Sequence, residues 1–230
     1  MKKHYIVAID GTAGSGKSTI AKGAAQELNW LYLDTGAMYR AVTYKIIEEK
    51  LNYQDEKLLK DLLDRTEIDF RYHPEEANYQ IYLDGKNVTR FIRNPKVDQL
   101  VSHISLIPLV REQMVKEQRK IAQGKNTICE GRDIGTVVFP NADLKFFVDC
   151  DLDERARRRK QDLGESVGYE EIRNNLIERD YIDSTREISP LKRDKAAIYL
   201  DTTNLKINEE IAIVVLIIKM RLLSQNNYKT

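Results

Sequence analysis

The sequence predicts an α/β fold: a P-loop parallel sheet with helices on both faces, plus a small antiparallel β insertion. Five short apolar runs alternate with segments whose apolar residues recur at helical spacing, which is typical of a parallel sheet covered by helices. The first run leads into a glycine-rich stretch and then a helical pattern, the order found around a phosphate-binding loop. Within residues 66–92 apolar and polar residues alternate, which indicates half-exposed antiparallel strands.

Length and charge narrow the class of protein. A chain of 230 residues can bury a full core as one domain, or as one domain with an insertion. Its 37 basic and 36 acidic residues give a net charge of +1, so we expect neither nucleic acid nor a membrane among its partners. We also expect a monomer. The N-terminus runs straight into the first strand, and the apolar run 211–218 is too short to span a bilayer, so we expect a cytoplasmic protein.

Cysteine and histidine usage gives no sign of a metal centre. Cys129 and Cys150 each lie inside an apolar run, so we expect small buried side chains rather than a disulfide or a metal pair. The three histidines are scattered along the chain, which predicts no structural metal site.

The first part of the chain alternates strand and helix. Residues 5–9 predict a buried strand, and residues 18–28 predict a helix with one apolar face. A second strand is predicted at 31–33, followed by helices at 37–49 and 55–65, where leucines recur at helical spacing.

Residues 66–92 predict a small antiparallel subdomain. Two strands are expected at 68–72 and 79–83, and the hairpin signal Asp84-Gly85 precedes a return strand at 86–89. Because this unit interrupts the α/β rhythm, we interpret it as an insertion into a P-loop core formed by residues 1–65 and 93–230.

The α/β pattern then resumes. Helices are predicted at about 95–105 and 108–124, each with a proline near its start, where the missing N–H costs little. The remaining predicted elements are strands at 127–129, 144–150 and 197–200, and helices starting at Asp153, at 169–182 and at 209–223, the last capped by Asn208.

The glycine-rich stretch, residues 11–18, reads GTAGSGKS and matches G-x-x-x-x-G-K-[ST] at every fixed position. Its glycines carry no Cβ, so the backbone can take φ > 0 and approach phosphate oxygens with its N–H groups. Lys17 can reach the β- and γ-phosphates, and the Ser18 hydroxyl can hold Mg²⁺. The alternative is a glycine-rich turn with a surface lysine, but the strand and helix around the motif favour a nucleoside triphosphate site. The expected nucleotide-binding residues are Gly11, Thr12, Ala13, Gly14, Ser15, Gly16, Lys17, Ser18 and Thr19.

Polar clusters follow three of the predicted strands: Asp10, residues 34–40 and residues 130–133. Ligands of open parallel sheets bind beyond the carboxyl ends of the strands, so three such clusters favour a site over solvated loops with helix caps. Arginines crowd the predicted helix after Asp153, and two more lie at Arg179 and Arg186. Guanidinium groups bind phosphate oxygens bidentately, although a basic helix alone is more often a solvated face.

Five segments in order resemble those of bacterial cytidylate kinases: GTAGSGKS, DTGAMYR, EGRDIGTVVFP, ERARRR and ERDYIDSTRE. The resemblance covers nearly the whole chain, and it includes the antiparallel insertion. DTGAMYR and GRDIGTVVFP are much more specific than the phosphate-binding loop, which many unrelated enzymes share. One departure is visible, because many members have glycine where Ser18 stands; serine restores the general motif.

The resemblance implies a role for each cluster. Thr35, Tyr39 and Arg40 would line the CMP site, and Arg40 would bind the CMP phosphate together with Arg132 and Arg186. Ser102, Arg111 and Asp133 would contact the cytosine edge, and Arg179 and Asp183 the ribose hydroxyls. A lid would span about 155–168, with Arg155 and Arg159 on the ATP phosphates, and the insertion would lie on the acceptor side. The expected catalytic residues are Lys17, Arg132, Arg155, Arg159 and Arg186.

The activity that the resemblance implies is transfer of the ATP γ-phosphoryl group to CMP, and to dCMP as well, with Mg²⁺ as cofactor. One alternative is a kinase for another small acceptor such as UMP or shikimate, which only the family-specific segments argue against. A GTP-dependent switch would need an N-K-x-D segment, which the sequence lacks. A nucleic-acid binder using the arginine helix is disfavoured by the near-zero net charge.

Overall fold

The computed structural model of the chain describes residues 4–73, 75, 78–164 and 167–223. The chain divides into two compact units. Unit 1 consists of Met1–Leu33 and Gly124–Thr230, and unit 2 consists of Asp34–Gln123. Unit 1 therefore contains the phosphate-binding loop and the arginine-rich segments, whereas unit 2 contains the DTGAMYR segment and the predicted insertion.

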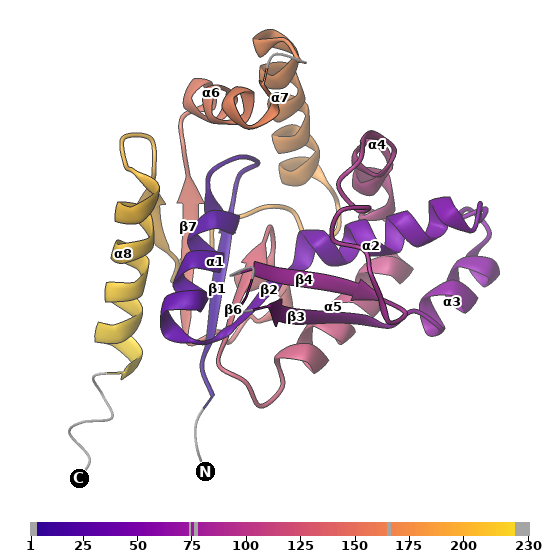
Figure 1. The fold of residues 1–230 in the computed structure, drawn as a ribbon, viewed down its shortest axis with the longest axis horizontal. Helices are drawn as coiled ribbons and strands as arrows, with labels where there is room; N and C mark the ends of the chain where they lie inside the picture. Colours follow the sequence, from indigo (N-terminus) through magenta and orange to yellow (C-terminus); the bar gives the residue numbers. More distant parts are fainter. Residues whose placement is uncertain (1–3, 74, 76–77, 165–166, 224–230) are drawn as a thin grey trace. The chain divides into compact units, whose positions relative to one another are not determined.

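A five-stranded parallel sheet forms the centre of unit 1 (Figure 1). Its strands are β1 (Ile6–Gly11), β2 (Leu31–Asp34), β6 (Thr127–Gly131), β7 (Leu144–Asp149) and β8 (Ile198–Asp201). The strand order is β2-β6-β1-β7-β8, so β1 lies in the middle with parallel partners on both sides. Val7, Ala8 and Ile9 of β1 are completely buried, as expected of an apolar run in a central parallel strand.

The described residues of unit 1 form four α-helices. They are α1 (Lys17–Leu28), α6 (Leu152–Leu163), α7 (Tyr169–Thr185) and α8 (Ile207–Ile218), which continues into a π-helical turn, η4 (Lys219–Leu223). Helix α1 packs against α8, and α6 packs against α7 (Figure 1). Asp151 caps α6, because its carboxylate accepts hydrogen bonds from the N–H groups of Asp153 and Glu154.

In unit 2 the structure describes four α-helices and a small sheet. The helices are α2 (Thr35–Glu48), α3 (Glu56–Asp64), α4 (Pro95–Ile104) and α5 (Pro108–Ala122), and the antiparallel strands are β3 (Ile68–His73), β4 (Asn78–Leu83) and β5 (Lys86–Asn87). Asp34, Asp55 and Asn94 cap α2, α3 and α4 with their side chains. Asp84 and Gly85 both have positive φ at the turn between β4 and β5, the conformation that the Asp-Gly hairpin signal predicts.

The predicted fold class is confirmed: the chain has a five-stranded parallel sheet and a three-stranded antiparallel sheet. Both cysteines are buried, as expected. The boundary between core and insertion stays a prediction, since the segment 66–92 forms one compact unit with α2–α5. Part of that segment, residues 74 and 76–77, lies outside the described residues. Among the helices that the structure describes, none is long and apolar enough to cross a bilayer.

Two local predictions differ from the structure. Helix α8 begins at Ile207 rather than after a cap at Asn208. The reason is that Glu209 turns its carboxylate back to accept a hydrogen bond from the Lys206 N–H at 2.8 Å, which moves the helix start towards the N-terminus. The second difference is a π-helical turn, η2 (Ile134–Val138), where the sequence indicates no helix.

Candidate active site

The phosphate-binding loop connects β1 to α1, and its three motif glycines serve two purposes. Gly14 and Gly16 have φ of 77° and 85°, as the motif predicts. Gly11 differs from the prediction, because it is the last residue of β1 and does not have positive φ. A Cβ there would lie 2.0 Å from the carbonyl oxygen of Val148, so Gly11 lets β1 approach β7 closely rather than turning the chain.

Lys17 is the first residue of α1 and is buried. Its Nζ donates a hydrogen bond to the Thr12 carbonyl oxygen at 3.0 Å, so the amine is held across the loop. Burial, and secondarily the nearby charge of Arg132, lower the pKa of Lys17 to about 7, although Glu130 opposes the change. The loop therefore places a readily titratable amine where the motif predicts nucleotide phosphates.

We expect ATP binding to draw a proton onto Lys17. At pH 8 an amine with a pKa near 7 is mostly neutral, and triphosphate oxygens favour its charged form, so binding should take up close to one proton, about 0.9 from these values. At pH 6 Lys17 is already charged, so its uptake should vanish. Calorimetry of ATP binding in buffers of different ionisation enthalpy measures the proton count, and Lys17→Met serves as the control. Equal proton counts for wild type and Lys17→Met at pH 8 would contradict this assignment.

Ser18 lies beside an acidic residue at the end of a neighbouring strand. Its Oγ donates to Glu130 Oε1 at 2.7 Å, and the Tyr32 hydroxyl donates to the same oxygen at 3.2 Å. Glu130 is buried, at 3% exposure. A hydroxyl and a carboxylate are the hard oxygen donors that Mg²⁺ prefers, so these residues fit the predicted cation.

Asp10, at the end of β1, organises the segment after β6. It accepts hydrogen bonds from the N–H groups of Ile134 and Gly135, both at 2.7 Å, at the start of η2. Burial raises the pKa of Asp10 to about 6, although the two backbone hydrogen bonds oppose the change. This contact holds the chain directly after Arg132 and Asp133, two of the predicted site residues.

Four of the predicted substrate residues form an ion-pair cluster in unit 1. Arg132 Nε donates to Asp183 Oδ2 at 2.6 Å, and Arg186 lies 3.7 Å from Asp133 Oδ1 and 3.9 Å from Asp183 Oδ1. Burial would raise the pKa of Asp183, but the arginines outweigh it and hold the carboxyl below its usual pKa. The cluster thus presents fixed guanidinium groups from two segments, around residues 132 and 186, that lie far apart in sequence.

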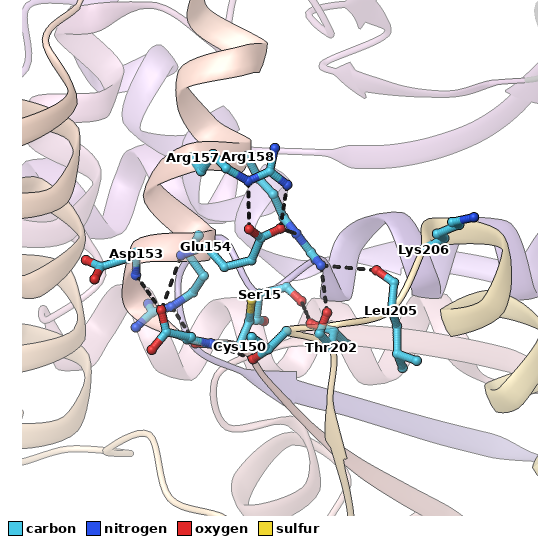
Figure 2. Close-up of polar contacts among 12 residues, drawn as sticks. Ser15, Cys150, Asp153, Glu154, Arg157, Arg158, Thr202, Leu205 and Lys206 are labelled. Atoms are coloured by element: carbon cyan, nitrogen blue, oxygen red, sulfur yellow. Dashed lines mark hydrogen bonds and ion pairs between the residues drawn. The ribbon is translucent and has the colours of Figure 1, made fainter.

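The arginines of α6 separate into different environments. Arg155 is buried and donates to the Ala13 carbonyl oxygen at 2.9 Å and to Asp180 at 2.5 Å. Arg158 joins α6 to the chain after β8, because its guanidinium donates to the carbonyl oxygens of Thr202 and Leu205 (Figure 2). Arg159 is exposed and forms no ion pair with any described residue. The predicted lid at 155–168 thus includes buried and exposed arginines; its residues 165–166 lie outside the described part of the chain.

The contacts of Arg158 extend to the phosphate-binding loop. Glu154 accepts a hydrogen bond from Arg158 at 2.8 Å, and Thr202 donates its hydroxyl to the Ser15 carbonyl oxygen at 3.1 Å (Figure 2). Glu210 also accepts from Arg158, at 3.1 Å. The beginning of α6, the chain after β8 and the loop are therefore connected by one polar network.

Unit 2 holds the other predicted acceptor residues. Arg111 is buried on α5, with its guanidinium 5.7 Å from the centre of the Tyr39 ring, and it donates to the Ser105 carbonyl oxygen. Ser105 in turn donates its hydroxyl to the carbonyl oxygen of Ser102. These contacts link α2, α4 and α5, so Tyr39, Ser102 and Arg111 belong to one part of unit 2.

Two further predicted residues lie on α2. Arg40 donates to Asp98 Oδ1 at 2.5 Å, which ties α2 to α4. Thr35 is buried in the first turn of α2, beside the Asp34 cap. The predicted acceptor residues are thus divided between a cluster in unit 1 and a cluster in unit 2.

Three acidic residues contact the phosphate-binding loop, and the sequence predicts no role for them. Glu130 contacts Ser18, Asp149 accepts from the Thr12 hydroxyl at 2.9 Å, and Asp180 accepts from the Ala13 N–H at 3.1 Å. Glu130 and Asp149 could have been suspected, because both end strands that flank β1. No sequence signal connects Asp180 to a loop 167 positions away.

Comparisons with known proteins identify the family of the chain. Residues 7–220 match the protein family described as Cytidylate kinase. A cytidylate kinase of Carboxydothermus hydrogenoformans is 47% identical over 209 residues, covering 90% of this chain and 93% of that protein. A cytidylate kinase of Halalkalibacterium halodurans is 44% identical over 224 residues, covering 96% of this chain and 100% of that protein.

A solved structure resembles the fold as well. The crystal structure of an uncharacterized protein from Eubacterium ventriosum superimposes with a TM-score of 0.53 at 15% identity, covering 95% of this chain and 100% of that one. At this identity the likeness concerns the fold alone.

Proposed function

Because this chain belongs to the cytidylate kinase family, we propose that the residues described above transfer the γ-phosphoryl group of ATP to CMP, releasing CDP and ADP. The chain is a nucleoside monophosphate kinase that uses ATP. The observation that carries the assignment is the match over residues 7–220, which includes both the phosphate-binding loop and the acceptor segments. We extend the proposal to dCMP as a second acceptor.

The reaction needs positioning and charge neutralisation more than proton transfer. An oxygen of the CMP phosphate attacks the γ-phosphorus, the bond from that phosphorus to the β–γ bridging oxygen breaks, and ADP leaves. The acceptor phosphate is mostly ionised at pH 7, because its second pKa is about 6, so no general base is required. Lys17 neutralises charge between the β- and γ-phosphates, and the backbone N–H groups of the loop bind their oxygens.

Mg²⁺, when bound, would neutralise phosphate charge, and Ser18 and Glu130 are the residues that would hold it. Their oxygens lie 2.7 Å apart, with Glu130 buried and Ser18 exposed, and both are hard oxygen donors that suit this cation. The proposed donor residues are completed by Arg159, whose exposed side chain can move onto the ATP phosphates.

The proposed acceptor residues have distinct tasks. Arg40, Arg132 and Arg186 neutralise the CMP phosphate. Arg179 and Asp183 bind the ribose hydroxyls. Asp133, Ser102 and Arg111 contact the cytosine edge, while Thr35 and Tyr39 line the pocket.

A panel of acceptors tests the proposal. ADP release from ATP is measured with CMP, dCMP, UMP, AMP, GMP and shikimate, each with Mg²⁺ and again with excess chelator. We expect turnover with CMP and dCMP, much weaker turnover with UMP, and none without Mg²⁺. Preferred turnover of UMP or shikimate would assign the chain a different acceptor and overturn the proposal.

A further inference from the structure

We propose that Asp180 and Arg155 are positioning residues that hold the phosphate-binding loop in its ATP-binding shape by fixing both backbone polar groups of Ala13. This inference rests on the proposed function, because it concerns the ATP side of the same site. In this proposal Arg155 orients the loop and does not contact ATP directly. Asp180 becomes a further residue on which ATP binding depends.

The contacts converge on one residue of the loop. Ala13 donates its N–H to Asp180 Oδ1 at 3.1 Å and accepts at its carbonyl oxygen from Arg155 Nη1 at 2.9 Å. Arg155 and Asp180 also pair with each other at 2.5 Å. A third contact, from Arg155 Nε to the Cys150 carbonyl oxygen at 2.9 Å, ties the guanidinium to the end of β7. The buried arginine is therefore already engaged on several sides.

Because peptide groups are planar, orienting the backbone groups of Ala13 also orients the Thr12 carbonyl and the Gly14 N–H. In a trans peptide the C=O and the following N–H point in opposite directions. With its N–H directed at Asp180, the peptide before Ala13 turns the Thr12 carbonyl oxygen the other way, and that oxygen accepts from Lys17 Nζ at 3.0 Å. With its carbonyl directed at Arg155, the peptide after Ala13 likewise sets the direction of the Gly14 N–H.

The loop needs such an anchor because its middle is intrinsically loose. Gly14 and Gly16 have positive φ, and glycine has access to more backbone conformations than any other residue. Ala13 is buried in a small apolar cluster with Ala156 of α6 and with Ile172 and Leu176 of α7. Packing holds Ala13 in place, and the Asp180–Arg155 pair orients its backbone groups.

The chain provides a matched control for a substitution of Asp180. Asp153 of α6 accepts from Arg173 Nε of α7 at 2.8 Å, so this exposed pair joins the same two helices without a contact to the loop. Asp153→Asn therefore weakens the link between α6 and α7 alone, whereas Asp180→Asn and Asp180→Ala also alter the anchor of Ala13.

The primary measurement is ATP affinity by calorimetry without any acceptor. We expect Asp180→Ala to raise the Kd for ATP roughly 10- to 100-fold, the range expected when a hydrogen bond to a charged group is lost. The KM for CMP should change little. Asp180→Asn should lose less, because its amide oxygen can still accept from the Ala13 N–H, and Asp153→Asn should match wild type. In ¹⁵N-resolved NMR spectra, the Ala13 amide proton should move upfield in both Asp180 variants and not in Asp153→Asn.

Arg155→Ala, alone and combined with Asp180→Ala, decides how the arginine acts. If both residues act through Ala13, the double variant should bind ATP about as weakly as the single variants. Full additivity would mean that Arg155 contacts ATP directly and would overturn the proposal, as would equal losses in Asp180→Ala and Asp153→Asn. Thermal unfolding shows whether each variant is folded. If Asp180→Ala does not fold, Asp180→Asn is used in its place, with the Ala13 amide shift as the readout. Failure of the proposed function shows separately, as wild type that binds ATP but does not phosphorylate CMP.

Discussion

Lys17→Ala is expected to remove most phosphoryl transfer while leaving the fold intact. The substitution deletes the cation beside the bond that breaks, and loss of a preorganised charge stabiliser raises the barrier by roughly 2–4 kcal/mol, or about 30- to 1000-fold in kcat. The fold should survive because Lys17 donates a hydrogen bond only to Thr12 among the described residues, and its buried charge opposes folding near neutral pH.

The measurement is kcat with saturating ATP and CMP, together with circular dichroism. Lys22→Ala is the matched control, since Lys22 lies on the same helix and outside the loop. A folded Lys17→Ala protein with wild-type turnover would show that the loop does not bind ATP in the proposed way.

Asp133→Ala is expected to narrow the preference for CMP over UMP. Cytosine carries an exocyclic amine donor where uracil has a carbonyl acceptor, and a carboxylate suits the first and repels the second. Asp133 is buried, at 5% exposure, and lies in the arginine cluster 3.7 Å from Arg186. Losing a hydrogen bond to a charged group should lower kcat/KM for CMP roughly 10- to 100-fold, and the loss for UMP should be much smaller.

The competing explanation is that Asp133 only pairs with Arg186. Steady-state kinetics with both acceptors separates the two, because a purely structural role lowers kcat/KM for CMP and UMP alike. The KM for ATP should change little, since the loop is untouched. Asp194→Asn is the control for loss of an ordinary ion pair, because Asp194 accepts from Lys145 at 2.8 Å and is not among the proposed site residues.

The sequence predicts those parts of the fold that local chemistry decides. The apolar runs predicted all five parallel strands, and the Asp-Gly signal predicted the hairpin between β4 and β5. The loop motif predicted positive φ at Gly14 and Gly16. These features depend on steric limits and burial patterns within a few neighbouring residues, so they can be read without knowing what packs against them.

The sequence does not predict local structure that depends on contacts with residues far away in the chain. Nothing near Gly11 shows that its missing Cβ serves the approach of β7, and nothing near residues 134–138 shows that Asp10 stabilises a π-helical turn there. Helix α8 starts earlier than the sequence predicts, because the Glu209 carboxylate accepts a hydrogen bond from the N–H of Lys206, two residues before Asn208.

The sequence by itself determined the fold class, the phosphate-binding loop and, through its family-specific segments, the reaction. Only the tertiary structure decided the environments of the charged residues: a buried Lys17 with a pKa near 7, and an Arg155 enclosed by Ala13, Cys150 and Asp180. The physical reason is that the free energy of a buried charge depends on which partners and how much water surround it. Glu130 and Arg132 come from the end of β6, and Arg155 lies on α6 with Asp180 on α7; all are far from the loop in sequence, and only the folded chain brings them to it.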